Sequence, residues 1–143
     1  MMYTLSSQYA IRTMLYLASL KDTKLRRIED VAESEEIPAA FLAKLVQRLV
    51  KKGLLHSLKG LNGGIKLGRP ANEITLFMIA DAIDDLSNIS FECALGSEKC
   101  SDRHPCVLHE RWKALRTTQI EFLQGITLNE LVNKPKAKRK RRS

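Results

Sequence analysis

The sequence lacks a long hydrophobic run, and this excludes a membrane-spanning helix of ordinary length. No stretch approaches the roughly eighteen consecutive apolar residues that a span requires. Yet 44% of the residues are hydrophobic, which is enough for a packed core. The first residues also lack the charged segment, apolar stretch and cleavage site of a signal peptide. We therefore expect a cytoplasmic protein with no membrane partner.

Motifs of nucleotide binding and catalysis are absent as well. The glycine-rich segment 59–64 matches neither a phosphate-binding loop nor a dinucleotide-binding fingerprint. No paired carboxylates and no nucleophile–base pair accompany the cysteines. The sequence therefore predicts a protein that is not an enzyme.

Cysteine is scarce, and all three copies lie in one short segment. Cys93, Cys100 and Cys106 are followed by His109 in the spacing C-x6-C-x5-C-x2-H. Their odd number agrees with reduced thiols, and thiolates with an imidazole can bind zinc or an iron–sulfur cluster. The alternative is three unrelated buried thiols. The polar residues between the cysteines indicate a surface loop, which favours the metal centre.

Positive charge is concentrated at the C-terminal end. The seven lysines and arginines from Lys134 onward account for all but one unit of the net charge of +8. We expect residues 134–143 to form a disordered basic tail that adds non-specific affinity for phosphates.

Apolar residues recur at helical spacing through the first part of the chain. The predicted helices cover residues 3–20, 27–34, 38–52 and 75–85. Ser6 or Ser7 is expected near the N-cap of the first helix. A tight turn joins the second and third helices, and the third has a basic outer face, as in a helix-turn-helix.

A β-hairpin is predicted directly after the third helix. Strands at 54–58 and 65–67 flank the glycine-rich turn. A hairpin in this place is typical of a wing, which approaches phosphates or a minor groove. Alternatives are a hairpin that only caps the helices, or a winged helix that binds RNA. We favour a double-stranded DNA operator as the partner.

The expected DNA contacts lie on the third helix and the wing. They are Ala39, Ala40, Ala43, Lys44, Gln47, Arg48, Lys51, Lys59 and Asn62. The alanines can meet thymine methyl groups, whereas Lys44 and Gln47 can read base edges. Arg48, Lys51 and Lys59 are better placed for phosphates. The acidic side chains of the second helix are assumed to lie mostly on the far side; they are Glu29, Asp30, Glu33, Glu35 and Glu36.

Residues 106–124 are predicted to form a long amphipathic helix. Its apolar stripe comprises Leu108, Trp112, Leu115 and Phe122, and Ile120 and Leu123 thicken it. Because such a stripe must be buried, we expect packing against a second copy, which suits two half-sites related by a two-fold axis. The alternative is that the helix folds back on its own domain. Thr127 has capping-box spacing and begins a last short helix.

The predicted fold is mainly α with a small β-hairpin wing. A winged helix-turn-helix DNA-binding domain is followed by a metal- or cluster-binding loop. A dimerisation helix with a short C-terminal helix and a basic tail complete the chain. The expected ranges of these four parts are 1–85, 86–105, 106–133 and 134–143.

The sequence resembles the Rrf2 family of bacterial winged helix-turn-helix regulators, and within it the iron–sulfur branch. The resemblance covers about residues 1–133. It rests on the three cysteines and on the segments Leu5–Ala10, Ile37–Leu42, Leu45–Leu49, Lys51–Leu54, Lys59–Ile65, Glu73–Leu76 and Ile126–Leu131. It implies a dimeric transcriptional regulator, which we expect to be a repressor. Its operator affinity would follow a [2Fe–2S] or [4Fe–4S] cluster that senses redox state, nitric oxide or iron–sulfur status.

The resemblance also implies a ligand set. By position, Cys93, Cys100 and Cys106 would be the thiolate ligands, and His109 matches the family's histidine ligand. Other members use a carboxylate at the position of Gln8, which is neutral here. The alternatives are a structural zinc ion, no metal, or a cluster-bearing redox protein. We expect the cysteine loop to act on the recognition helices through the fourth helix.

The chain departs from the family pattern at the DNA-contacting positions. The wing of the family usually carries Arg and Pro where this chain has Lys59 and Leu61. The acidic base-reading residue of the recognition helix is replaced by Ala43. Lysine is a point charge where arginine offers a planar fork, so contacts in the minor groove are expected to differ.

Overall fold

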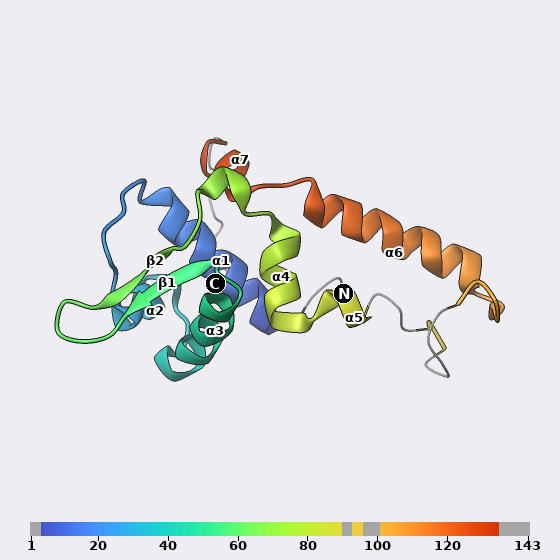
Figure 1. Cartoon of the computed structure of the whole chain (residues 1–143), viewed down its shortest axis with the longest axis horizontal. Helices are drawn as coiled ribbons and strands as arrows, with labels where there is room; N and C mark the ends of the chain where they lie inside the picture. Colours follow the sequence, from blue (N-terminus) through green and yellow to red (C-terminus); the bar gives the residue numbers. More distant parts are fainter. Residues whose placement is uncertain (1–3, 90–92, 96–100, 135–143) are drawn as a thin grey trace, which may run out of the picture.

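The computed structural model describes residues 4–89, 93–95 and 101–134 (Figure 1). The elements in chain order are α1 (Leu5–Ser19), α2 (Ile28–Glu35), α3 (Ala39–Lys51), β1 (Leu55–Leu58), β2 (Gly64–Leu67), η1 (Ala71–Glu73), α4 (Leu76–Asp84), α5 (Leu86–Ile89), α6 (His109–Gln124) and α7 (Leu128–Val132). The predicted helices and hairpin are thus confirmed, with their ends shifted by a few residues. The short helices η1 and α5 were not predicted.

Three threonines determine where helices begin. Thr4, Thr75 and Thr127 are the N-caps of α1, α4 and α7, and each hydroxyl accepts a hydrogen bond from a backbone N–H in the first turn. The cap expected at Thr127 is confirmed. The expectation of Ser6 or Ser7 at the N-cap of α1 is wrong, because both lie inside the helix and Thr4 supplies the cap.

The wing is joined to the body of the molecule by backbone hydrogen bonds. β1 and β2 pair antiparallel, with Leu55 opposite Leu67 and Ser57 opposite Ile65. Ile65 also exchanges two backbone hydrogen bonds with Arg26, at 2.8 and 2.9 Å, and its side chain is fully buried. The segment before α2 therefore acts as a third, one-residue strand that fixes the base of the wing.

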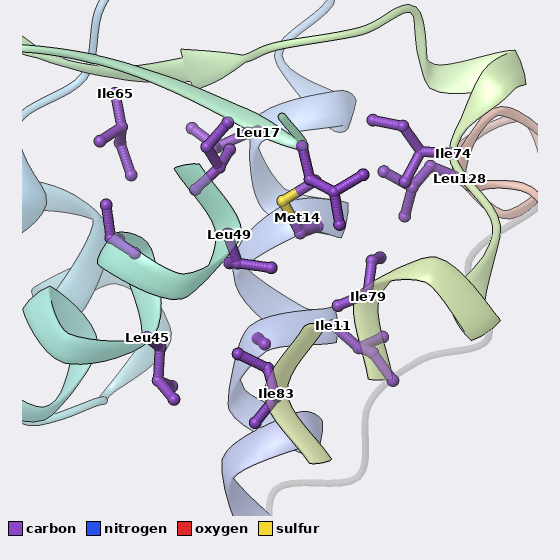
Figure 2. Packing of buried hydrophobic residues seen from close by; sticks show 14 of the residues in the cluster. Ile11, Met14, Leu17, Leu45, Leu49, Ile65, Ile74, Ile79, Ile83 and Leu128 are labelled. Atoms are coloured by element: carbon purple, nitrogen blue, oxygen red, sulfur yellow. The ribbon is translucent and has the colours of Figure 1, made fainter. Parts of the chain in front are cut away.

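The hydrophobic core lies where α1, α3 and α4 meet. Met14, Leu49 and Ile79 are fully buried there (Figure 2). Leu128 of α7 joins the same core, and its N–H donates to the carbonyl of Ile74 at 2.9 Å. Helix α7 is therefore part of the same packed body as α1, α3 and α4, even though α6 separates it from that body in sequence.

Helix α6 projects away from this body (Figure 1). Its only buried residues are His109 near its start and Leu123 near its end. It begins at His109 and not at the predicted position 106, since residues 106–108 form a turn whose Cys106 carbonyl accepts from the His109 N–H. Among the described helices, none is long and apolar enough to cross a membrane.

Candidate functional site

The outer face of α3 is exposed as the sequence predicts. Leu42, Leu45, Val46 and Leu49 of its inner face are buried in the core. On the outer face, the exposed residues are Ala39, Ala40, Lys44, Gln47, Arg48 and Lys51, and Ala43 is half-buried. The burial of one apolar stripe therefore orients small and basic side chains outward.

Arg12 of α1 fixes the turn between α2 and α3. Its guanidinium donates to the backbone carbonyl of Glu35 and lies 3.4 Å from the Glu35 carboxylate. It also lies over the ring of Tyr9, 5.6 Å from the centroid. A cation at the C-terminus of α2 interacts favourably with the helix dipole, so these contacts hold α2 in place ahead of α3.

A groove of about 770 Å³ separates α3 from the wing. It brings together three of the predicted contact residues, Ala43, Gln47 and Lys59. Glu29 and Asp30 at the start of α2 line the same groove. The assumption that the acidic residues of α2 lie on the far side is therefore wrong for these two.

The segment from α3 through the wing carries positive charge only. Between Glu36 and Glu73 there is no aspartate or glutamate. The same segment contains Lys44, Arg48, Lys51, Lys52, Lys59, Lys66 and Arg69. A polyanion that approaches α3 and the wing therefore meets basic side chains from both elements, and the acids close to them are Glu29 and Asp30 of α2 in the groove.

Arg48 differs from the other cations of α3, because its side chain turns toward the body. Its Nη1 donates a hydrogen bond of 2.8 Å to the carbonyl of Ile83. Ile83 lies in the last turn of α4, where unpaired carbonyls attract a cation. Helix α3 is thereby joined directly to the C-terminus of α4.

Several hydrogen bonds meet at the α4–α5 junction, residues 81–87. The Asp84 carboxylate accepts from the Thr4 N–H and hydroxyl at 2.9 and 2.6 Å and from the Ser7 hydroxyl at 2.7 Å. The Asp81 carboxylate accepts from the N–H and hydroxyl of Ser87 at 2.9 and 3.0 Å. Together with the bond from Arg48, these contacts connect α1, α3 and α5 at one place.

The structure brings two of the three cysteines together. The sulfur atoms of Cys93 and Cys106 lie 3.5 Å apart, whereas Cys100 lies outside the described residues. Two thiolates bound at about 2.3 Å to one tetrahedral metal ion have sulfurs roughly 3.7 Å apart. The observed separation therefore fits a pair of ligands to one zinc or iron atom. Within the described ranges, no three or more His, Cys, Asp or Glu side chains gather as a complete metal site.

His109 is the buried residue of this segment, with 3% of its surface exposed. Its Nε2–H donates a 2.8 Å hydrogen bond to Oδ1 of Asp102. Lys113, one turn along α6, lies 3.0 and 3.3 Å from the same carboxylate. Hydrogen bonds from His109 and Lys113 hold the pKa of Asp102 below its usual value, and the bond to Asp102 raises the pKa of Lys113. A carboxylate in this place orients the imidazole, as is common around metal-binding histidines.

The wing and the cysteine segment lie far apart in one chain. The wing occupies one end of the long axis, and the start of α6 (orange) occupies the other (Figure 1).

Exposed apolar side chains lie along one face of α6 and just before it. Leu115 and Phe122 are each 50% exposed, and Leu108 just before the helix is 42% exposed. They are spaced by seven residues, so they lie on one face of the helix. Leu123, in contrast, packs into the core of its own chain. The predicted stripe is thus divided between the body and an uncovered face.

Sequence reasoning missed three side chains that organise these sites. Asp102, Asp84 and Arg12 are charged residues, and no spacing rule distinguishes them from surface charges. Their partners are distant along the chain or depend on an irregular turn. Only the three-dimensional arrangement identifies them.

Comparisons with known proteins identify a family of transcriptional regulators that is similar to this chain over most of its length. The Rrf2 family, described as iron-dependent transcriptional regulators, matches residues 3–134. The HTH-type transcriptional regulator IscR of Pectobacterium atrosepticum is 35% identical over 133 residues, which cover 93% of this chain and 80% of the relative.

Two solved structures have the same fold. CymR, the global cysteine regulator of B. subtilis, aligns with a TM-score of 0.73 and 26% identity, over 90% of this chain and 94% of that one. T. potens IscR aligns with a TM-score of 0.71 and 23% identity, over 90% and 84% of the two chains. The winged helix fold predicted from the sequence is therefore confirmed.

Proposed function

The chain belongs to the Rrf2 family of transcriptional regulators and is not an enzyme, and from this premise we propose that it is a cytoplasmic, homodimeric repressor whose operator affinity depends on an iron–sulfur cluster. The observation that carries the proposal is the cysteine segment. Two thiol sulfurs lie 3.5 Å apart in it, and a buried histidine oriented by a carboxylate follows directly.

The proposed DNA interface is the outer face of α3 together with the wing. Ala39, Ala40 and Ala43 would meet thymine methyl groups in the major groove, because they are small and apolar. Lys44 and Gln47 would read base edges, and Lys51 and Lys59 would contact phosphates. We assign Arg48 mainly to the body, since its hydrogen bond to Ile83 already engages the guanidinium.

The proposed dimer forms through α6. Its uncovered face holds Leu115 and Phe122, each half exposed, and the helix projects beyond its own body (Figure 1). A second copy would cover this face in an isologous contact. Two α3 helices would then be available for the two half-sites of an operator.

The proposed ligands of the cluster are Cys93, Cys100, Cys106 and His109. A [2Fe–2S] or [4Fe–4S] cluster, when bound, supplies sulfur–iron bonds that oxidants and nitric oxide attack. Asp102 would hold the imidazole in one orientation through the Nε2–H hydrogen bond. The 3.5 Å sulfur separation fits zinc equally well, so a structural zinc ion is the second candidate.

The α4–α5 junction is the proposed connection between the cysteine segment and the recognition helix. A shift of α5 would disturb the Asp81–Ser87 contact and with it the end of α4. The bond from Arg48 to Ile83 would transmit that change to α3.

Metal analysis tests the proposed cofactor. Protein purified without oxygen should contain iron and acid-labile sulfide and show visible absorption, and Cys100→Ala should lose these while it remains folded. Zinc in place of iron would support the structural alternative. A colourless wild-type protein without iron, sulfide or zinc would contradict any metal centre.

A further inference from the structure

The wing ends in a tight turn. The N–H of Gly63 donates to the carbonyl of Gly60 at 3.0 Å and closes a β-turn with Leu61 and Asn62 at its centre. Gly60 has a φ of 111°, and a Cβ at Gly63 would lie 2.1 Å from the Leu58 carbonyl oxygen. Glycine is therefore required on both sides of the turn, so Leu61 and Asn62 are the two side chains at the tip.

Leu61 is almost fully solvent-exposed. Its relative exposure is 90%, although contact of an apolar side chain with water is unfavourable. One exposed leucine needs no special explanation by itself. Here, however, the turn is held at a fixed place, because the Arg26–Ile65 backbone bonds fix the base of the hairpin. The turn between β1 and β2 lies away from the helices of the body (Figure 1).

The charges around the tip select the class of partner. Lys59 directly precedes the turn, Lys66 lies further along β2 opposite His56, and the whole segment between Glu36 and Glu73 lacks carboxylates. A tip with an exposed leucine, on a hairpin that carries only positive charges, suits a polyanion with a recessed, less polar floor. The minor groove of B-DNA has this character and is about 6 Å wide, which admits a hairpin tip that is flanked by glycines.

We propose that Leu61 and Asn62 enter the minor groove and select A·T over G·C pairs there. The Asn62 amide would donate to the adenine N3 or thymine O2 acceptors at the groove edge. Leu61 would lie where guanine projects its N2 amino group, and burial of that donor against an apolar side chain leaves it unpaired. This inference rests on the proposed DNA binding and adds a specificity determinant to it.

Inosine substitution tests the proposal without changing the major groove. An operator duplex is selected from genomic fragments, and hydroxyl-radical footprinting locates the pairs beneath the wing. At those pairs, A·T, G·C and inosine·C duplexes are compared by fluorescence anisotropy at one salt concentration. The wild type should bind the G·C duplex about tenfold more weakly than the A·T duplex, and inosine, which lacks the N2 amino group, should restore affinity.

The variants separate the tip from the rest of the interface. Leu61→Ala and Asn62→Ala should reduce the difference between G·C and inosine·C. Leu5→Ala, which removes a leucine on α1 that is 55% exposed, should retain it. The proposal that the tip selects A·T pairs would be overturned if the wild type bound all three duplexes with equal affinity. It would also be overturned if Leu61→Ala still distinguished G·C from inosine·C as fully as the wild type does. Either result would leave the proposed DNA binding intact. A wild type that binds no duplex would overturn the proposed function as well.

Discussion

Arg48 illustrates what a single residue adds to the sequence pattern. Its position on the basic face of α3 favours a phosphate contact, and in the structure it donates to Ile83 instead. Helical periodicity gives the face of a residue but not the direction in which a long, flexible side chain turns. Thr4 is a similar case, because Ser6 and Ser7 are equally good caps by type and only the backbone decides among them.

Loss of the Arg48 side chain should therefore reduce stability. Arg48→Ala removes a charge-assisted hydrogen bond and should lower the free energy of unfolding by about 1–2 kcal/mol in urea titrations. Lys51→Ala is the matched control, which should weaken DNA binding without a change in stability. Arg48→Ala with unchanged stability and weaker binding would mean that Arg48 acts as a phosphate contact only.

Asp102 should matter for metal affinity although it is not a proposed ligand. Asp102→Asn weakens the acceptor that orients His109, so competition with a chelator should show a roughly ten- to hundredfold loss of metal affinity. Glu110→Gln changes the neighbouring exposed acid on α6 and should have no such effect. Equal metal retention in both variants would remove Asp102 from the site.

At the scale of elements, the sequence predicts what periodicity and caps determine. Helices α1 to α4, the wing and α7 have apolar spacing, a threonine cap or a glycine turn, and they lie where expected. The short helices η1 and α5 are too brief to show a period. For α6, the apolar stripe was evident, but its division into Leu123 in the core and Leu115 in solvent depends on how far the helix projects.

This division predicts how the dimer can be disrupted. Leu115→Lys places a charge on the uncovered face of α6 and should convert the dimer to a monomer at micromolar concentration in sedimentation velocity. Thr117→Lys, at an exposed position about half a turn away, should remain dimeric. A Leu115→Lys protein that sediments as the wild type would exclude this face as the interface.

At the scale of the whole molecule, the wing and the cysteine segment lie at opposite ends of the long axis (Figure 1). The sequence places the cysteines directly after α4 and α5, and this proximity suggests direct action on the DNA-binding body. The structure instead carries the start of α6 away from that body. We propose that a signal from the cysteines passes through α5 and the end of α6 to α4, which both of these helices contact.

The central claim is that the state of the cysteine-bound centre determines how tightly the dimer binds DNA. The most direct measurement is the dissociation constant for one selected operator duplex at fixed salt, with the same anaerobic preparation before and after nitric oxide treatment and after removal of the metal. We expect the protein with an intact centre to bind the duplex at least about tenfold more tightly than the protein with a damaged or empty centre. A factor of this size is typical of coupling between two sites. Equal dissociation constants in all three states would contradict the account.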